Sequence, residues 1–403
     1  MPLTDSQRVV MGLCALAVGG RLPELPWPES DQAWQEVVQV AHAHQLEPFV
    51  ADALLKLPER PCPVRGELLR AGRTTARIAW RLAYDTRALV DMLQEKGLRP
   101  LVLKGSTVAQ FYPVPDLRKS GDIDLFVGDD EQFAQSCACF EEQGFTKVQE
   151  PSGSHHQTYL SAAGYEIEVH RHFGRGFGHA TVDECLKRAE QEAWRRGPRC
   201  FEYLPGLKIP GLADAELAYS LVIHMVQHQL RGGFGLRLLL DWVAYWSVEH
   251  DPGEVERLNG YLRDSGLMTL CSVVNACCVR WLGMDAQTSR GLASLPVQSE
   301  VAEAFLEDVL RNGEFGNADK VAMIAPEKAS IAGYAQTFHQ QMRLNYPRAS
   351  KVFVCWPALW LATLVTFVRN NAKVRHVKTS DVLRSAFRRG KAAEGLHLFE
   401  RGH

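Results

Sequence analysis

Residues 101–127, LVLKGSTVAQFYPVPDLRKSGDIDLFV, decide the fold of this chain. The apolar start, 101–103, predicts a short buried strand. A second strand is predicted at 121–127, where alternation places Asp122 and Asp124 on one face. Two neighbouring carboxylates repel each other, and burying them is costly unless a cation compensates for them. The pair therefore indicates a divalent-metal site, because Mg²⁺ is commonly bound by one or two carboxylates together with substrate phosphates.

This stretch resembles the nucleotidyltransferase fold of the DNA polymerase β type. The resemblance rests on a set of residues within one short span: Lys104, Gly105, Ser106, Arg118, Ser120, Gly121, Asp122 and Asp124. It is similar to two bacterial branches, an uncharacterised nucleotidyltransferase family with the pattern LKG…R..GDIDLLV and an abortive-infection or toxin-like branch with KGGT…R.S.DID. Gly121 fits the first branch and Ser120 fits the second. The resemblance covers about residues 101–246, and the first branch fits better.

A second alternating stretch, 165–172 (YEIEVHRH), supplies a third acid. Glu168 and His170 share one face of this predicted strand with Glu166. The letters EVHR match the element (D/E)-(L/V)-H-(W/R) of the family that the chain resembles, although family members often carry Asp at the acid. An edge strand with a solvated acidic face is the alternative. With Asp-x-Asp upstream we favour a functional Glu168, with Glu166 as the substitute third acid.

The resemblance implies a metal-dependent nucleotidyltransferase that moves a nucleoside monophosphate from an NTP, ATP or GTP, to an acceptor. Asp122, Asp124 and Glu168 would be the catalytic residues and would hold Mg²⁺ or Mn²⁺. The nucleotide-binding residues would be Lys104, Gly105, Ser106, Arg118 and Gly121. In this scheme backbone N–H groups at the Gly105–Ser106 turn face the triphosphate, and the two basic side chains neutralise its charge.

The acceptor is not encoded in a recognisable motif, and we expect a small molecule or a peptide. One alternative is a toxin-like enzyme acting on tRNA or protein, which predicts a basic groove beside the site. The other is a non-catalytic nucleotide-binding module, against which the three retained acids argue. The formal net charge of −2 provides no global basic field, so no DNA partner is expected.

Composition and periodicity predict an α+β protein with three regions. Residues 1–97 form a helical region, 98–210 the nucleotidyltransferase core, and 211–403 a second helical region with a basic tail. Within the two helical regions, continuous helices are predicted at 31–57, at about 66–95 and at 252–283. The ten cysteines lack zinc-ribbon spacing, and no basic leader begins the chain, so we expect a cytoplasmic protein.

Two pairs of histidines lie in predicted helices. His42 and His44 are spaced i,i+2 and do not share a helix face, so a structural role is expected. His224 and His228 are spaced i,i+4 and do share a face. We favour a structural role for this second pair, with a substrate contact (which would also suit His170) or a metal site as the alternatives.

Residues 352–368, VFVCWPALWLATLVTFV, form an uncharged run of near-membrane length. From 369 to the end, nine Lys/Arg stand against three Asp/Glu. We expect a buried helix with Trp356 and Trp360 packed against the helical region. Contact of 352–403 with a membrane surface, or a full span, are the alternatives.

Overall fold

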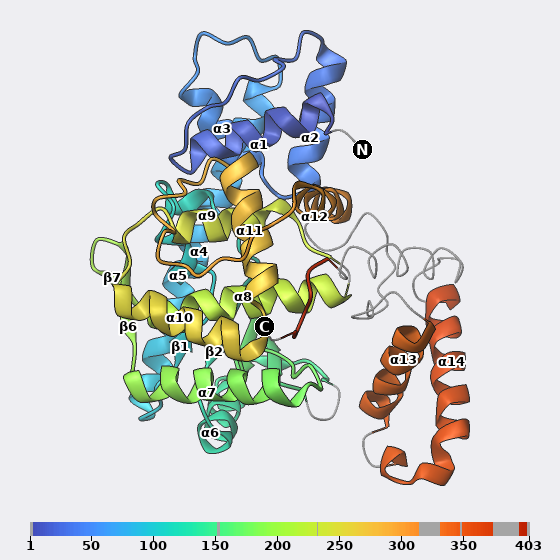
Figure 1. The fold of residues 1–403 in the computed structure, drawn as a ribbon. Helices are drawn as coiled ribbons and strands as arrows, with labels where there is room; N and C mark the ends of the chain where they lie inside the picture. The colour runs from blue at the N-terminus through green and yellow to red at the C-terminus, as the bar shows by residue number, and fades with distance from the viewer. Residues whose placement is uncertain are drawn as a thin grey trace.

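The computed structural model describes residues 3–150, 154–231, 233–313, 331–346, 349–373 and 395–400 (Figure 1). Over these residues the chain is α+β, as predicted. It contains a seven-stranded mixed sheet, and helical segments precede and follow the strands in the sequence. The helices before the sheet are α1 (Asp5–Ala17), α2 (Asp31–Ala43), α3 (Glu47–Leu55) and α4 (Arg65–Glu95). The helices after it are α8 (Asp214–Arg231), α9 (Leu236–Tyr245), α10 (Pro252–Ser265), α11 (Met268–Trp281), α12 (Ser299–Asn312), α13 (Ile331–Asn345) and α14 (Trp356–Lys373).

The sheet has the strand order β3-β4-β5-β2-β1-β7-β6. Its strands are β1 (Leu101–Val102), β2 (Asp122–Phe126), β3 (Thr146–Lys147), β4 (His156–Leu160), β5 (Glu166–His170), β6 (Arg199–Leu204) and β7 (Leu207–Gly211). Three helices lie between strands in the sequence: α5 (Ser106–Ala109), α6 (Asp130–Glu142) and α7 (Ala180–Arg196). Strands β2 and β5 are parallel neighbours, and β1 pairs antiparallel with β2.

The alternation of β2 and β5 separates an apolar face from an acidic one. Ile123, Leu125, Ile167 and Val169 are buried in one hydrophobic cluster with α4 and α6. This packing fixes the register, because a shift of one residue would carry the apolar side chains to the opposite face. The acids of both strands therefore project from the other face, toward the helices of the C-terminal half.

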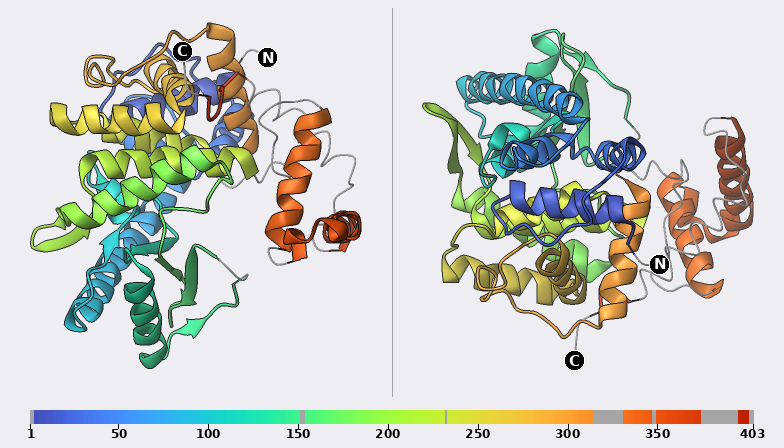
Figure 2. Two further views of the ribbon diagram at one scale, coloured as in Figure 1. Left: turned by 60° about the horizontal axis from the view of Figure 1, so that its bottom comes forward. Right: turned by 90° about the horizontal axis from the view of Figure 1, so that it is seen from above.

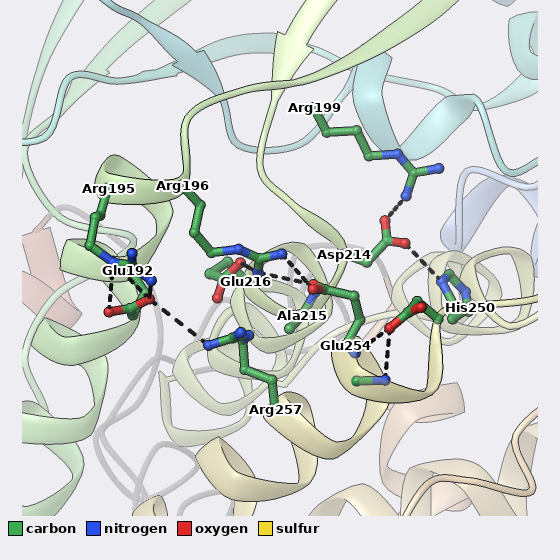
Figure 3. Close-up of polar contacts among 12 residues, drawn as sticks. Glu192, Arg195, Arg196, Arg199, Asp214, Ala215, Glu216, His250, Glu254 and Arg257 are labelled. Carbon is green, nitrogen blue, oxygen red and sulfur yellow. Dashed lines mark hydrogen bonds and ion pairs between the residues drawn. The ribbon is translucent and has the colours of Figure 1, made fainter.

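A partly buried ionic network joins α7 to α8 and α10 (Figure 3). Nη1 of Arg196 lies 2.7 Å from Oε2 of Glu216, which is fully buried, and 3.0 Å from Oε2 of Glu254. Tyr261 donates to the second oxygen of Glu216 at 2.8 Å, and the backbone N–H of Ala215 donates to Glu254 at 3.2 Å. These contacts fix α8, the helix that carries His224 and His228.

Two helices that the sequence predicts as continuous are broken in the structure. The predicted helix at 31–57 divides into α2 and α3 at Gln45, whose φ of 57° is left-handed, and Pro48 lies in the first turn of α3. The predicted helix at 252–283 divides at Gly266, which ends α10 in the left-handed conformation.

Helices α13 and α14 form a hairpin at the side of the molecule (Figure 1). The ring of His339 in α13 contacts Trp356 and accepts from Trp360 Nε1 at 3.2 Å. The expectation of a buried helix at 352–368 is wrong, because the opposite face of α14 is open: Leu361 is 63% and Val365 55% exposed. Among the described residues no helix combines the length and apolar character needed to cross a bilayer. Most of the basic tail, 374–394 and 401–403, lies outside the described residues.

Candidate functional site

Two pairs of acids face each other across β2 and β5. The parallel register places Asp122 beside Glu166 and Asp124 beside Glu168. Asp124 is 1% exposed, while the side chain of Asp122 is 35% exposed. The predicted spacing of the acids on one face is thus present in the structure, and Glu168 is the acid that lies beside the buried Asp124.

Lys104 follows β1 and supplies a positive charge to this acidic face. Its Nζ lies 3.4 Å from Oδ2 of Asp122 and 3.3 Å from Oδ2 of Asp124. Burial by itself lowers the pKa of Lys104, but the carboxylates of Asp122, Asp124 and Glu168 outweigh burial and raise it above its usual value. Lys104 therefore stays charged and neutralises part of the acidic cluster.

His170 at the end of β5 links the two inner acids. Its Nε2 lies 3.0 Å from Oδ1 of Asp124 and 3.0 Å from Oε2 of Glu168. Burial opposes its protonation, yet the hydrogen bonds to both carboxylates raise the pKa of His170 to about 9. The reverse holds for Glu168: burial raises its pKa, and the contacts with His170 and Lys104 lower it to about 2.

Arg118 forms its ion pair with Asp241 of α9 and not with the acids of β2 and β5. Its Nε and Nη2 each donate to a different oxygen of Asp241 at 2.7 Å, a bidentate arrangement in which both side chains are almost fully buried. Tyr112 donates to Asp241 at 2.7 Å, and Nη1 of Arg118 donates to Ser120 Oγ at 2.7 Å. Arg118 was predicted to bind a phosphate. In the structure most of the N–H donors of its side chain are already used in hydrogen bonds within the protein. Arg237, four residues before Asp241, lies 3.9 Å from it.

The glycines of the motif shape the loops around the acids. Gly105 has a φ of 68°, a left-handed value that favours glycine. Gly121 and Gly105 line the same cavity as Asp122. Ser106 begins α5 and is not among the residues that line this cavity. The turn predicted at Gly105–Ser106 is present, but α5 is only four residues long.

The acidic face opens into a cavity of about 600 Å³ between the sheet and helices α8 and α9. Of the sequence-predicted residues, all but Ser106 and Asp124 line it: Lys104, Gly105, Arg118, Gly121, Asp122, Glu168, His170, His224 and His228. The rings of His224 and His228 are 4.5 Å apart, and burial, with Lys104 next, holds the pKa of His224 well below its usual value. A second, more open hollow of similar volume borders this cavity at His155 and is lined by Arg171, Arg175 and Lys187.

Sequence reasoning missed several residues of the site. Lys119 and Arg237 line the cavity and bring cationic side chains to it. His155 and His156 enter it from the start of β4, where His156 Nε2 lies 3.8 Å from Oε1 of Glu168. The adjacent histidines were a visible signal, because alternation on β4 and β5 aligns His156 with His170.

The described residues contain two groups of side chains that could hold a metal ion, one of Asp124, Glu168 and His170 and one of His155, His156 and His170. In the first, the ligand atoms lie within 4.8 Å of one another. Oδ2 of Asp124 is buried and, apart from the ion pair with Lys104, has no hydrogen-bond partner among the described residues, and a carboxylate oxygen of this kind suits a hard cation. His224 and His228 belong to neither group.

The chain matches a known protein family. The pattern of the family described as uncharacterised nucleotidyltransferase fits residues 30–283, which include the sheet, the acids, the cavity and helices α2 to α11. None of the curated proteins matches the chain.

Proposed function

Because the chain belongs to the uncharacterised nucleotidyltransferase family, we propose that it transfers a nucleoside monophosphate from ATP or GTP to an acceptor in a metal-dependent reaction. The observation that carries the proposal is the pairing of Asp124 with Glu168 on parallel neighbouring strands, beside a cavity lined by Lys104, Lys119 and Arg237. Acids and cations gathered at one cavity suit a triphosphate whose charge must be both bound and neutralised.

The reaction balances as a simple substitution at phosphorus. An acceptor hydroxyl oxygen forms a bond to the α-phosphorus of the NTP, and the bond from that phosphorus to the bridging oxygen breaks. Pyrophosphate leaves, and the hydroxyl proton passes to water. Catalysis then depends on positioning and charge neutralisation rather than on covalent chemistry by the protein.

The side chains divide these tasks. Glu168 is ionised because its pKa is about 2, so it serves as a charged ligand and orients the acceptor rather than storing a proton. Lys104 and Arg237 face the triphosphate. Asp122, Asp124 and Glu168 would hold Mg²⁺ or Mn²⁺, which when bound lowers the pKa of the attacking hydroxyl and neutralises the leaving group.

Nucleotide binding and transfer test the proposal directly. Purified protein would be titrated with fluorescent ATP and GTP with and without Mg²⁺, and then incubated with α-³²P-labelled NTP, Mg²⁺ or Mn²⁺ and cell extract. We expect metal-dependent binding and a labelled product, both weakened in Asp124→Asn and Glu168→Gln. The matched control is Glu131→Gln on the exposed side of α6.

Two results would contradict the proposal. Unchanged Mg²⁺-dependent binding in an Asp122→Asn/Asp124→Asn double variant would refute the metal role. Nucleotide binding without any labelled product, across both nucleotides and both metals, would favour the non-catalytic binding module.

A further inference from the structure

The outward face of α4 carries a row of arginines and aromatic rings, which we name the arginine stripe. Its members are Arg70, Arg73, Arg77, Trp80, Arg81 and Tyr84. All six are exposed; Trp80 is 47% and Tyr84 58% exposed. Figure 2 shows α4, in light blue, at the outer edge of the molecule in both views.

The stripe is a consequence of helical periodicity. At 100° per residue its six positions fall within about a third of the circumference of the helix. The opposite face, which includes Leu68, Ala79, Leu82 and Leu89, is buried. From residue 70 to 84 the stripe is about 21 Å long at 1.5 Å per residue.

In the middle of the stripe the positive charge is uncompensated among the described residues. No acid lies between residues 70 and 84 in the sequence. Among the described residues Arg73 and Arg77 have no ion-pair partner; Arg70 shares a small surface hollow with Asp31 and Glu67. Solvated arginines contribute little to the free energy of folding. The stability of α4 therefore does not explain why exposed arginines and exposed aromatic rings share one face.

The end of the stripe is linked to the rim of the cavity, which opens on the other face of the sheet. Nε of Arg81 lies 3.5 Å from Oδ2 of Asp85, and that oxygen accepts a hydrogen bond from the hydroxyl of Tyr165 at 2.7 Å. Tyr165 lines the cavity next to Glu166. A chain of contacts therefore runs from the stripe to the rim of the cavity, where the Tyr165 ring packs in the apolar cluster on the α4 side of the sheet.

We propose that the acceptor is a single-stranded RNA whose backbone lies along the arginine stripe and whose terminal hydroxyl enters the cavity; this rests on the proposed function. Guanidinium groups bind phosphates in a bidentate manner, and exposed Trp and Tyr rings stack on unpaired bases. A length of about 21 Å accommodates a few nucleotides of an extended strand, whereas a small molecule would leave most of the stripe unused. RNA ends and loops offer the unpaired bases that the rings need.

In the reaction the terminal ribose hydroxyl of the RNA attacks the α-phosphorus of the NTP. The RNA gains one nucleotide through the new phosphodiester bond, and pyrophosphate leaves. The sequence alone pointed the other way, because its basic residues concentrate in the tail and a small acceptor was expected. The periodicity of α4 gathers four arginines on one face without changing the net charge.

Binding would be measured first, without NTP and with EDTA, so that catalysis plays no part. A fluorescein-labelled 12-nucleotide poly-U RNA would be titrated with the full chain by anisotropy at several salt concentrations. We expect Arg73→Gln/Arg77→Gln to weaken binding at least tenfold and to reduce the salt slope by about 1.4, since each phosphate contact of a single strand contributes about 0.7. Trp80→Ala should weaken binding about tenfold through lost stacking.

The matched control is Arg21→Gln/Arg290→Gln, which removes the same charge from exposed positions outside α4. Circular dichroism would verify that every variant is folded. Equal binding by the stripe variants and the wild type would overturn the proposal, as would equal weakening in the control. Binding of an acidic peptide but not of RNA would also overturn it.

Transfer of label to the oligonucleotide is the second arm. With α-³²P-labelled NTP and Mg²⁺, the stripe variants should label RNA at least tenfold less while binding fluorescent NTP as the wild type does. Equal labelling of RNA by these variants, or equal labelling of a DNA of the same sequence, would overturn the RNA assignment. If the wild-type protein did not bind NTP at all, the proposed nucleotidyl transfer itself would be contradicted. Failure of the RNA proposal can therefore be distinguished from failure of the proposed function.

Discussion

At the scale of single residues, the two aspartates of β2 have different surroundings. Asp124 is buried between Lys104 and His170, while the side chain of Asp122 is about one-third exposed and forms an ion pair with Lys104. Repulsion between the two carboxylates would by itself make either Asn substitution harmless to the fold. The structure changes this expectation for Asp124, because its removal leaves the buried His170 and the partly buried Lys104 with less compensating negative charge.

We therefore predict unequal stabilities for the two variants. Asp124→Asn should lower the free energy of unfolding by about 3 kcal/mol, as for other broken buried ion pairs. Asp122→Asn should lower it by less than about 1 kcal/mol, as for a partly exposed pair. Urea unfolding without metal measures both, and equal losses would show that Asp124 is not held by Lys104 and His170.

The pairing of Arg118 with Asp241 leads to a second residue-scale prediction. Both side chains are buried, and the hydroxyl of Tyr112 also donates a hydrogen bond to Asp241. Asp241→Ala should lower the free energy of unfolding by about 3–5 kcal/mol, because it strands a buried guanidinium. The matched change at an exposed helix position, Asp91→Ala, should cost about 1 kcal/mol or less. If Arg118 were chiefly a phosphate ligand, Asp241→Ala would reduce NTP affinity with little change in stability.

These residues also show what sequence reasoning can reach. Period-two alternation is a local property, so it placed Asp122, Asp124 and Glu168 on one face correctly. Arg118 and Asp241 are 123 residues apart in the sequence, and no local pattern indicates that they meet. The motif therefore singled out Arg118 without indicating which residue it contacts.

At the scale of elements, His44 connects three helices. It lies at the end of α2, its Nδ1 accepts from the backbone N–H of Leu236 in α9 at 3.2 Å, and its Nε2 donates to the carbonyl of Leu310 in α12 at 3.2 Å. The expected structural role of His44 is confirmed. Burial lowers its pKa from 6.5 to about 4, although the hydrogen bond to Leu310 opposes the shift.

A pH dependence of stability follows from this histidine. The folded protein keeps His44 neutral down to about pH 4, while the unfolded chain binds a proton below about 6.5, so the unfolded state binds more protons between these values. The free energy of unfolding should fall by about 3 kcal/mol from this group as the pH drops through that window. Urea unfolding of the wild type and of His44→Gln from pH 7.5 to 4 measures the difference.

The His44→Gln variant should be less stable than the wild type at pH 7.5, because it lacks one of the two hydrogen bonds of His44. Its free energy of unfolding should also depend less on pH. His42→Gln, at a side chain 80% exposed, should retain most of the wild-type fall. A fall of the same size in His44→Gln would mean that other groups cause it.

The type of an element, helix or strand, was predictable where the apolar periodicity extended over many residues. The boundaries of the elements were not predictable. The helix at α4 and the strands β2 and β5 lie where the pattern placed them. The breaks at Gln45 and Gly266 were missed because the apolar spacing continues across both. The hairpin of β6 and β7 was also missed: β7 completes the sheet through one pairing with β1, a long-range contact with no local signal.

At the scale of the whole molecule, the α13–α14 hairpin is the part that the sequence misplaced. The uncharged sequence of residues 352–368 predicts a buried helix, but it does not indicate which part of the protein covers that helix. In the structure one face of α14 packs on α13, while Leu361, Leu364, Val365 and Val368 remain exposed on the other. The hairpin follows residues 30–283, the span shared with the family, so its apolar face is not part of the shared nucleotidyltransferase unit.

A polar substitution distinguishes an exposed α14 from a buried one. Leu361→Gln should change the free energy of unfolding by no more than about 0.5 kcal/mol, because a 63% exposed side chain loses little contact. The matched change in a buried helix, Leu306→Gln in α12 at 1% exposure, should cost about 3 kcal/mol or more, since it removes apolar contacts and buries an amide. Urea unfolding of the full chain measures both variants. A loss at Leu361 as large as that at Leu306 would mean that α14 is covered within the folded protein in solution, and the buried helix expected from its uncharged sequence would then be right after all.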